Sequence, residues 1–373
     1  MSGAEALALL RDLAAPAGIG TAVVLIACLA IVATQRWHGH LTHDTITGVQ
    51  KFHRAPTPRI GGLAIALGYM AVWPALPVDL RPMWLTIGIA ALPAFAAGIA
   101  EDVTRRVGIR RRLFATMGAG VLFALLTGYT MHHVDLPGVD WLLAVPFIAV
   151  LFTGFAMGGV ANAINIIDGF NGLAAGALLI MLATFAYVGL RVGDELVVAL
   201  AVIYAGLVLG FFAVNFPHGR IFLGDGGAYG CGFLLAGLGV LLPMRNPEVS
   251  AWGAILICAY PVIETLASMR RKSRRHGHSV GQPDRVHFHM LAHRRYARRM
   301  VRLPERVHLR NPATSVVTWA MPLFTAALVT IAYDSVWLSV AGFFLTVYVY
   351  GQLYRIMSLN PPRRLPLGLA RLL

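Results

Sequence analysis

The stretch LVVALAVIYAGLVLGFFAV, residues 196–214, contains no charged side chain along its whole length. A helix needs about 20 mostly apolar residues to cross a hydrocarbon core about 30 Å thick, so this stretch is typical of a transmembrane helix. The rest of the chain is similar, because 57% of its 373 residues are hydrophobic and only 13% are charged. Soluble domains carry about 25% charged residues. The sequence therefore predicts an all-α, polytopic integral membrane protein.

Similar apolar blocks precede and follow this one, which predicts about eleven transmembrane helices in a single domain covering residues 1–373. The only long polar segment is the basic stretch 269–313, which we expect to be a loop. Its length makes it a candidate functional element rather than a plain connection. The eleven blocks are residues 16–34, 61–78, 83–100, 113–130, 141–160, 173–190, 196–214, 227–243, 250–268, 314–333 and 336–354.

The distribution of Lys and Arg predicts how these helices are oriented. An odd number of spans places the two termini on opposite sides, and cytoplasmic loops carry an excess of Lys and Arg. The loops on the side of the C-terminus hold 27 of the 31 Lys and Arg. We therefore expect the N-terminus outside and the C-terminus in the cytoplasm, which also makes 269–313 a cytoplasmic loop.

The formal net charge of +14 has two readings. Positive loops beside anionic lipid need extra Lys and Arg whatever the function, and basic loops can also gather polyanionic substrates. No basic domain stands free of the predicted membrane segments, so we do not expect a nucleic-acid partner.

Three aspartates indicate where a functional site lies. Asp102, Asp168 and Asp225 are each predicted at the cytoplasmic end of a helix, in polar or glycine-rich surroundings. Carboxylates near a membrane core are costly and tend to mark function. Any one of them could be a helix cap or a solvated loop acid, but three on the same side favour a shared site.

Asparagines and glycines surround two of these acids. Asp168 belongs to NAINIIDGFNGLAAG, residues 162–176, where Asn162, Asn165 and Asp168 recur at a spacing of three. This spacing places their side chains along one face of a helix. Asp225 lies between two glycines at a predicted helix entrance, where flexible backbone lets a ligand approach closely.

Histidines supply a further element in DRVHFHMLAH, residues 284–293. Zinc binding is not favoured, because cysteines and zinc-ligand spacing are missing nearby. Contact with phosphate fits the basic surroundings better.

Hard oxygen ligands indicate Mg²⁺, which is usually held by one or two carboxylates plus substrate phosphates. These residues together indicate a membrane enzyme that acts on phosphate esters at the cytoplasmic face.

The same residues form motifs that resemble a known family. The chain is similar to the polyprenyl-phosphate N-acetylhexosamine-1-phosphate transferases, in particular the bacterial branch that starts O-antigen, enterobacterial common antigen and teichoic acid synthesis. The matching motifs are KFHRAPTPRIGG at 51–62, the acidic pair at 101–102, NAINIIDGFNGL at 162–173, IFLGDGG at 221–227 and HFH at 287–289.

The resemblance implies transfer of a sugar 1-phosphate from a UDP-N-acetylhexosamine to undecaprenyl phosphate, which releases UMP. It implies a bacterial inner membrane protein with a periplasmic N-terminus, a cytoplasmic active site, Mg²⁺ or Mn²⁺ as cofactor and a homodimeric state. An alternative within the enzyme class is the phospho-MurNAc-pentapeptide transferase of peptidoglycan synthesis. An alternative from another class is a secondary transporter, but transporters place coupling charges near the bilayer midplane and often show repeats.

The resemblance also implies roles for individual residues. Asp225 and Asp168 are expected to hold the metal, and Asp102 is expected near the acceptor phosphate; all three are candidate catalytic residues. Phe222 matches an aromatic residue that stacks on uracil. The full set of side chains expected to contact substrate is Lys51, His53, Asn162, Asn165, Asn171, Phe222, His287 and His289.

The chain departs from the family pattern at three positions. Glu101 precedes Asp102 where many members have a second aspartate, and Asn171 stands where many have a carboxylate. Met290 follows the HFH motif, whereas the peptidoglycan-precursor transferases have a longer histidine run. These departures favour an O-antigen-type enzyme over the peptidoglycan branch.

Glycines lie within or near several motifs and have a plain structural explanation. Small residues let membrane helices approach closely. We therefore expect close helix packing rather than substrate contact at Gly61, Gly62, Gly98, Gly158 and Gly159.

Overall fold

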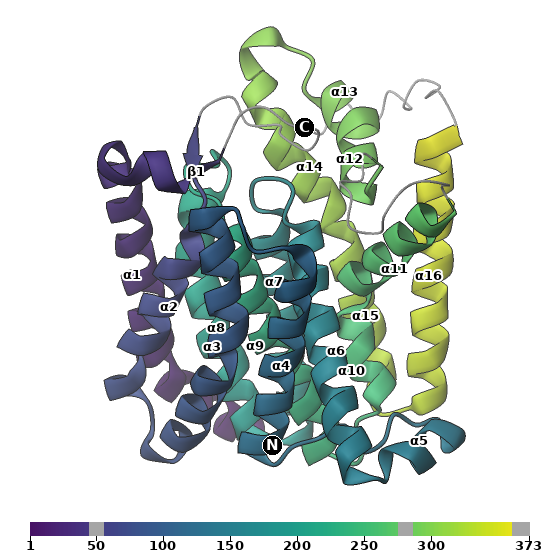
Figure 1. Ribbon diagram of the computed structural model, residues 1–373. Helices are drawn as coiled ribbons and strands as arrows, with labels where there is room; N and C mark the ends of the chain where they lie inside the picture. Colours follow the sequence, from purple (N-terminus) through teal and green to yellow (C-terminus); the bar gives the residue numbers. More distant parts are fainter. Residues whose placement is uncertain (45–55, 275–285, 360–373) are drawn as a thin grey trace.

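The protein is a bundle of roughly parallel helices in the computed structural model, which describes residues 1–44, 56–274 and 286–359 (Figure 1). Helix α1 starts at the lower end of the bundle and α16 ends at the upper end (Figure 1). The long helices are α1 (Gly3–Thr42), α3 (Arg81–Thr104), α4 (Ile109–Thr127), α6 (Pro146–Ile167), α7 (Leu173–Val192), α8 (Glu195–Asn215), α9 (Gly224–Arg245) and α16 (Val336–Leu359).

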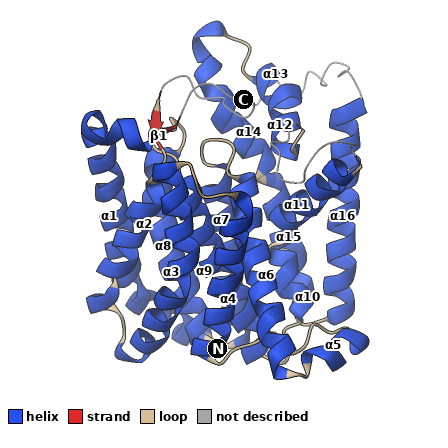
Figure 2. Ribbon diagram, viewed as in Figure 1, coloured by secondary structure: helices blue, strands red, loops and turns tan. Residues whose placement is uncertain are grey.

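Shorter elements complete the chain. Almost all of them are helical, as Figure 2 shows. They are α2 (Gly61–Ala71), α5 (Pro137–Leu143), α10 (Ala251–Ile257), α11 (Ala259–Ser273), α12 (Phe288–Ala292), the π-helix η3 (His293–Ala297), α13 (Arg298–Met300), α14 (Arg310–Thr318), α15 (Ala320–Ala332) and three 3₁₀ turns, η1 (Trp73–Ala75), η2 (Val78–Leu80) and η4 (Pro304–Leu309). The strands β1 (His43–Asp44) and β2 (Thr57–Pro58) pair antiparallel, with His43 opposite Pro58.

Apolar surface determines where each helix lies. Helices α7, α8 and α9 are the most deeply buried and form the centre, whereas α1 and α16 expose most of their apolar side chains at the periphery. An exposed apolar surface of this extent would be unstable in water but is expected in lipid. The all-helical, polytopic membrane architecture predicted from the sequence is thus confirmed.

The predicted number of spans is not confirmed. Within the described residues, eight helical segments are long and apolar enough to cross a membrane, or nine if α10 and α11 form one span bent by 79°. These eight include Glu305–Ala332, which joins η4, α14 and α15, and they leave out α4. Helix α2 has 11 residues, which at about 1.5 Å per residue is shorter than a hydrocarbon core. Pro74 and Pro77 follow it and separate it from α3. Helix α4 carries three consecutive arginines in its first turn.

The polar segment 269–313 contains short helices in its described part. Helix α11 continues to Ser273, and helical turns cover residues 288–300 and 304–313. These turns lie at the upper end of the bundle (Figure 1). The expected cytoplasmic location and functional role of this segment stay predictions; in its described part, its short helices pack against one another and against α16.

Glycines bring the helices around α9 into backbone contact. A Cβ atom at Gly62 would lie 2.2 Å from the backbone nitrogen of Gly227, and one at Gly98 would lie 2.5 Å from the Cα of Gly226. Close packing is likewise confirmed at Gly61 and Gly158. It is wrong for Gly159, where a Cβ would meet nothing within 4 Å.

Gly62→Ala is expected to destabilise the protein, because the added methyl group would push the backbones of α2 and α9 apart. Overpacking of this kind costs about 1–3 kcal/mol. Gly159→Ala is the matched control, since it adds the same methyl group on an open helix face and Ala favours helix over Gly by about 0.5–1 kcal/mol. Thermal unfolding in detergent should give a lower Tm for Gly62→Ala only. Equal Tm values for the two variants would contradict the close contact.

Candidate functional site

Three aspartates predicted to share a site come from three helix ends. Asp102 lies in the last turn of α3, Asp168 directly follows α6, and Asp225 lies in the first turn of α9. The carboxylate of Asp102 is fully buried and accepts hydrogen bonds from the backbone N–H groups of Asp225 and Gly226, each at 2.9 Å. Asp102 therefore caps the N-terminus of α9, where a negative charge is favoured by the helix dipole.

Glycine at position 224 makes this cap possible. Gly224 has a φ of +74°, a conformation that other residues rarely adopt. A Cβ atom there would lie 2.0 Å from the carbonyl oxygen of Arg59 and 2.6 Å from Oδ2 of Asp102. The glycine-rich sequence around Asp225 thus lets the chain before α2 and the end of α3 approach the helix terminus.

Two arginines neutralise the aspartates. Arg59 donates from Nε and Nη2 to Oδ1 of Asp102, at 3.1 and 2.9 Å. Its Nη2 also lies 4.0 Å from Oδ1 of Asp225, and its Nη1 lies 3.8 Å from Oδ1 of Asp44. Arg112, from the first turn of α4, donates from Nη1 to Oδ2 of Asp225. The site is therefore a cluster of carboxylates with two guanidinium groups built into it.

Asn165 and Asp168 belong to the same cluster. Asn165 donates from Nδ2 to Oδ1 of Asp225 at 2.9 Å. The pKa of Asp168 is raised to about 7, mainly because its carboxyl group is removed from water, and further by the charge of Asp102, while Arg59 opposes the shift. The structure thus brings together four of the residues singled out in the sequence, namely Asp102, Asn165, Asp168 and Asp225.

Asn162 and Asn171 make contacts that join elements of the fold. Asn162 donates from Nδ2 to the hydroxyl of Thr116 and to the carbonyl of Gly158, both at 2.8 Å, which ties α6 to α4. Asn171 donates to the carbonyl of Pro217 at 3.1 Å. Both amide groups have a structural partner in the folded chain, so substrate contact by these two residues stays a prediction.

Phe222 and the basic motif flank the cluster. The backbone of Phe222 is held on both sides, because its N–H donates to Pro58 at 2.8 Å and its carbonyl accepts from Gly61 at 2.9 Å. Its side chain is half-buried, and stacking on a base stays a prediction. Lys51 and His53 lie outside the described residues.

The two predicted histidines are buried side by side. The rings of His287 and His289 stack with centroids 5.3 Å apart. The ring of His289 also meets Phe170 edge-on at 5.7 Å, and a Cβ at Gly169 would lie 2.8 Å from its Nε2. The histidine pair therefore lies against the turn that begins with Asp168.

Glu264 positions this histidine pair and was missed in the sequence. Its carboxylate, fully buried in α11, lies 2.8 Å from Nδ1 of His287 and accepts from the N–H of Phe288 at 3.0 Å. It also accepts from the hydroxyl of Tyr350 at 2.7 Å and from Arg271 at 3.2 Å. An acidic residue inside the apolar block 250–268 was the available signal.

Arg59 and Arg112 were missed for a different reason. Both lie in loops or helix starts where Lys and Arg are already explained by the predicted orientation in the membrane. Arg59 does lie within the matching motif at 51–62. Neither arginine, however, has a local sequence feature showing that it, unlike the neighbouring arginines, turns toward a carboxylate.

Glu264→Ala is expected to lower the free energy of unfolding by about 3 kcal/mol, because it leaves a guanidinium, an imidazole, a phenol and a backbone N–H without their buried acceptor. Glu248→Ala removes the same group from an exposed position and is the matched control. Thermal unfolding of the detergent-solubilised chain measures both. A Tm for Glu264→Ala equal to that of the control would show that these buried contacts contribute little.

The donor set of the cluster suits a magnesium ion. Within the described residues, no group of three or more His, Cys, Asp or Glu side chains is arranged to hold a metal ion. Mg²⁺ does not need such a group, because it is usually bound by one or two carboxylates while substrate phosphates and waters complete its shell. The partly exposed carboxylate of Asp225 is a hard oxygen ligand of the required kind.

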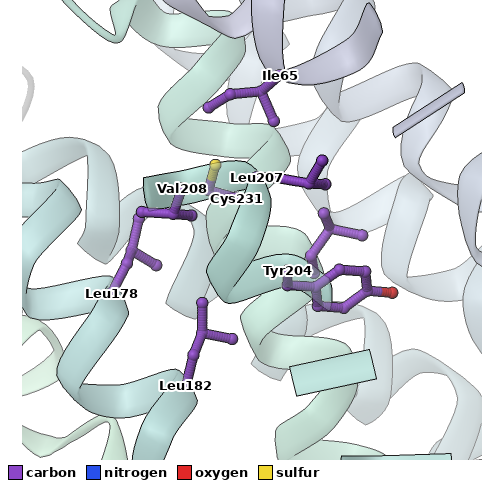
Figure 3. Close-up of a pocket in the computed structure, with 8 residues that line it drawn as sticks. Ile65, Leu178, Leu182, Tyr204, Leu207, Val208 and Cys231 are labelled. Carbon is purple, nitrogen blue, oxygen red and sulfur yellow. The ribbon is translucent and has the colours of Figure 1, made fainter. Parts of the chain in front are cut away.

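An apolar cavity in the bundle is separate from this cluster. It lies among α2, α7, α8 and α9, and Figure 3 shows aliphatic side chains converging on it with the hydroxyl of Tyr204 pointing to one side. None of the predicted site residues lines it. We interpret it as a packing void; its lining residues are Ile65, Leu178, Leu182, Tyr204, Leu207, Val208, Cys231 and Leu234.

The cluster has the features of a phosphate-binding site. A helix N-terminus, two guanidinium groups and nearby imidazoles can neutralise and orient phosphate oxygens. Carboxylates that hold a divalent cation add the charge compensation that phosphoryl transfer requires.

Known proteins with similar sequences are consistent with this chemistry. The family model described as "Glycosyl transferase family 4" matches residues 84–242, a range that includes Asp102, Asp168 and Asp225. Three curated relatives illustrate the similarity. The phospho-N-acetylmuramoyl-pentapeptide-transferase of Synechococcus sp. (strain JA-3-3Ab) is 30% identical over 251 residues, which cover 62% of this chain and 69% of the relative.

The other two relatives are 28% identical to this chain. The "probable undecaprenyl-phosphate N-acetylglucosaminyl 1-phosphate transferase" of Bacillus subtilis (strain 168) aligns over 64% of this chain and 66% of the relative. The decaprenyl-phosphate N-acetylglucosaminephosphotransferase of Mycobacterium tuberculosis (strain CDC 1551 / Oshkosh) aligns over 64% and 65%. The chain thus spans about two thirds of the length of the relatives it matches.

Proposed function

Since this chain belongs to glycosyl transferase family 4, we propose that it is a polyprenyl-phosphate sugar-1-phosphate transferase. The proposed reaction moves an N-acetylhexosamine 1-phosphate from its UDP donor to undecaprenyl phosphate and releases UMP. The observation that carries the proposal is the cluster of Asp102, Asp168 and Asp225 with Arg59 and Arg112 at the N-terminus of α9. The Bacillus and Mycobacterium relatives support it, because both are named as transferases that use a polyprenyl phosphate.

The reaction exchanges one phosphoanhydride bond for another. An oxygen of the acceptor phosphate attacks the β-phosphorus of the donor, and the bond from that phosphorus to the bridging oxygen breaks, so that UMP leaves with the electron pair. The acceptor is a phosphate monoester, which carries about −1.5 to −2 charge at pH 7. It needs no strong base, so positioning and charge neutralisation carry most of the catalysis.

The aspartates have distinct proposed roles. Asp225 and Asp168 would hold a magnesium ion, which when bound neutralises the diphosphate. Both oxygens of Asp102 already accept hydrogen bonds from Arg59 and from the start of α9. Asp102 therefore acts by holding Arg59 and the helix terminus in place for the acceptor phosphate, rather than by removing a proton.

The histidines and the position of the cluster complete the proposal. His287 and His289, held against the turn after Asp168, orient the donor diphosphate.

Asp44 of β1 lies near Arg59, and β1 lies at the upper end of the bundle (Figure 2). We propose that this end faces the cytoplasm of a bacterial inner membrane, as the Lys and Arg distribution predicts, and that the product primes an O-antigen-like polysaccharide.

A second candidate is transfer of phospho-N-acetylmuramoyl-pentapeptide. The Synechococcus relative, which is named for that activity, supports it. The missing histidine run after His289 favours the N-acetylhexosamine donor instead. A transporter is disfavoured, since the acids cluster at one helix terminus and pair with arginines there rather than lining a path through the bundle.

A panel of donors tests the proposed function. Membranes containing the chain are incubated with undecaprenyl phosphate, Mg²⁺ and labelled UDP-GlcNAc, other UDP-N-acetylhexosamines or UDP-MurNAc-pentapeptide. We expect an organic-extractable product from a UDP-N-acetylhexosamine and none when EDTA is present. A product from the pentapeptide donor alone would select the second candidate, and no product from any donor would exclude both.

A further inference from the structure

The two oxygens of Asp225 are held in different ways. Oδ1 accepts from Asn165 at 2.9 Å and lies 4.0 Å from Arg59. Oδ2 accepts from Nη1 of Arg112. The side chains of Asp225 and Arg112 are 16% and 15% exposed, so the pair is largely but not fully screened from solvent. One oxygen of this carboxylate is thus fixed within the cluster, and the other faces a single cation.

The two arginines of the cluster also differ in how firmly they are held. Arg59 places both Nε and Nη2 on Asp102 and turns Nη1 toward Asp44. Arg112 reaches the cluster through Nη1, while its Nε is buried with no hydrogen-bond partner among the described residues. A guanidinium with two donors on one carboxylate is held in both position and orientation. Arg112 lacks this anchoring.

The backbone position of Arg112 favours release as well. Arg112 is the fourth residue of α4, close to the positive end of the helix dipole, where a cation is disfavoured. The contact with Asp225 offsets this effect. Once another cation neutralises Asp225, this contact no longer offsets the repulsion between the guanidinium and the positive end of the helix dipole. The long, flexible arginine side chain then allows the guanidinium to move away.

We propose that Arg112 is a resident counter-ion of Asp225 that a divalent cation displaces when it binds the cluster. The inference rests on the proposed function for the identity of the cation. In the metal-free protein Arg112 compensates the charge at Oδ2 of Asp225, close to the carboxylate of Asp102. After displacement its guanidinium is free to contact the phosphates of the donor, so cation binding and donor binding are linked through one side chain.

This exchange predicts that removing Arg112 strengthens cation binding. Full-length protein is purified without divalent cations, and its Tm is measured against MgCl₂ concentration at constant ionic strength. We expect Arg112→Gln to lower the Mg²⁺ concentration for half-maximal stabilisation about five- to tenfold, as expected for loss of a competing charge beside a carboxylate. Arg112→Lys keeps the charge and should stay within about twofold of wild type.

Two further variants test whether the effect is specific to Arg112 and whether the cation binds at Asp225. Arg111→Gln removes the neighbouring charge, whose side chain is exposed on the same turn, and should leave the Mg²⁺ titration unchanged. Asp225→Asn should abolish the Mg²⁺-dependent rise in Tm. Equal titrations for Arg112→Gln and wild type, an equal shift in Arg111→Gln, or an unchanged Mg²⁺ response in Asp225→Asn would each overturn the exchange.

The titration is independent of turnover, so it separates this inference from the proposed function. If wild-type protein makes no lipid product while Arg112→Gln still binds Mg²⁺ more tightly, the transferase proposal fails and the exchange stands. If product forms but the titrations coincide, the exchange fails and the transferase proposal stands.

Discussion

Asp225→Asn is expected to reduce turnover about 10²–10³-fold, the size of effect seen when one key electrostatic group is removed from an active site. The asparagine keeps an oxygen that can accept from Asn165, so the local fold should persist. It loses the negative charge that now pairs with Arg112 and that would hold a magnesium ion. The rate of lipid product formation by purified protein measures the effect, and the Tm checks that the variant is folded.

Asp79→Asn is the matched control for this variant. Asp79→Asn is the same chemical change at an exposed position, in the 3₁₀ turn before α3. Asp102 lies at the opposite end of α3. Its turnover should stay within about twofold of wild type, because an exposed charge distant from the cluster contributes little. Turnover of Asp225→Asn within about tenfold of wild type would remove Asp225 from the proposed mechanism.

Asp102→Asn is expected to abolish turnover and also to destabilise the fold. Oδ1 of Asp102 accepts from Arg59 and from the N–H of Asp225, and Oδ2 accepts from the N–H of Gly226. In either orientation of an asparagine, its NH₂ group would face donors and leave at least one of them unsatisfied. Removing one partner of a buried charge pair costs about 3–5 kcal/mol, so the Tm should fall well below that of Asp225→Asn.

Glu101→Gln is the control for Asp102→Asn, one residue earlier in the same helix. Glu101 is half-buried, and its Oε2 accepts from the N–H of Val107 at 2.8 Å. A glutamine keeps an acceptor for that bond, so both the Tm and the turnover should change little. A Tm for Asp102→Asn equal to that of Glu101→Gln would show that the buried cap does not stabilise α9.

The sequence predicted those site residues that are acids in apolar surroundings, where a buried charge costs free energy. Asp102, Asp168 and Asp225 stand out because acids are rare in apolar sequence, and the structure brings all three to the start of α9. Glu264 gave the same signal within its apolar block and was overlooked. The arginine partners gave none, because a sequence shows where charges are tolerated but not which of several arginines folds toward a carboxylate.

The fold was predictable in class and less so in detail. Apolar runs reveal that a segment is buried in lipid but not whether its helix is continuous. The run 250–268 reads as one span, yet the helix breaks at Cys258 and turns by 79°. After the break, Glu264 in α11 binds donors from α12 and α16 that are distant in sequence. Contacts of this kind decide the helix geometry and leave no local pattern.

The fate of the β-phosphate tests the central claim most directly. A UDP-N-acetylhexosamine accepted in the donor panel is prepared with ³²P in its β-phosphate and ³H in its sugar, and the purified chain is incubated with it and undecaprenyl phosphate. We predict that both labels enter the lipid product in equal molar amounts while one UMP is released for each product. Transfer of the sugar label without the phosphate, or release of UDP in place of UMP, would contradict a sugar-1-phosphate transferase.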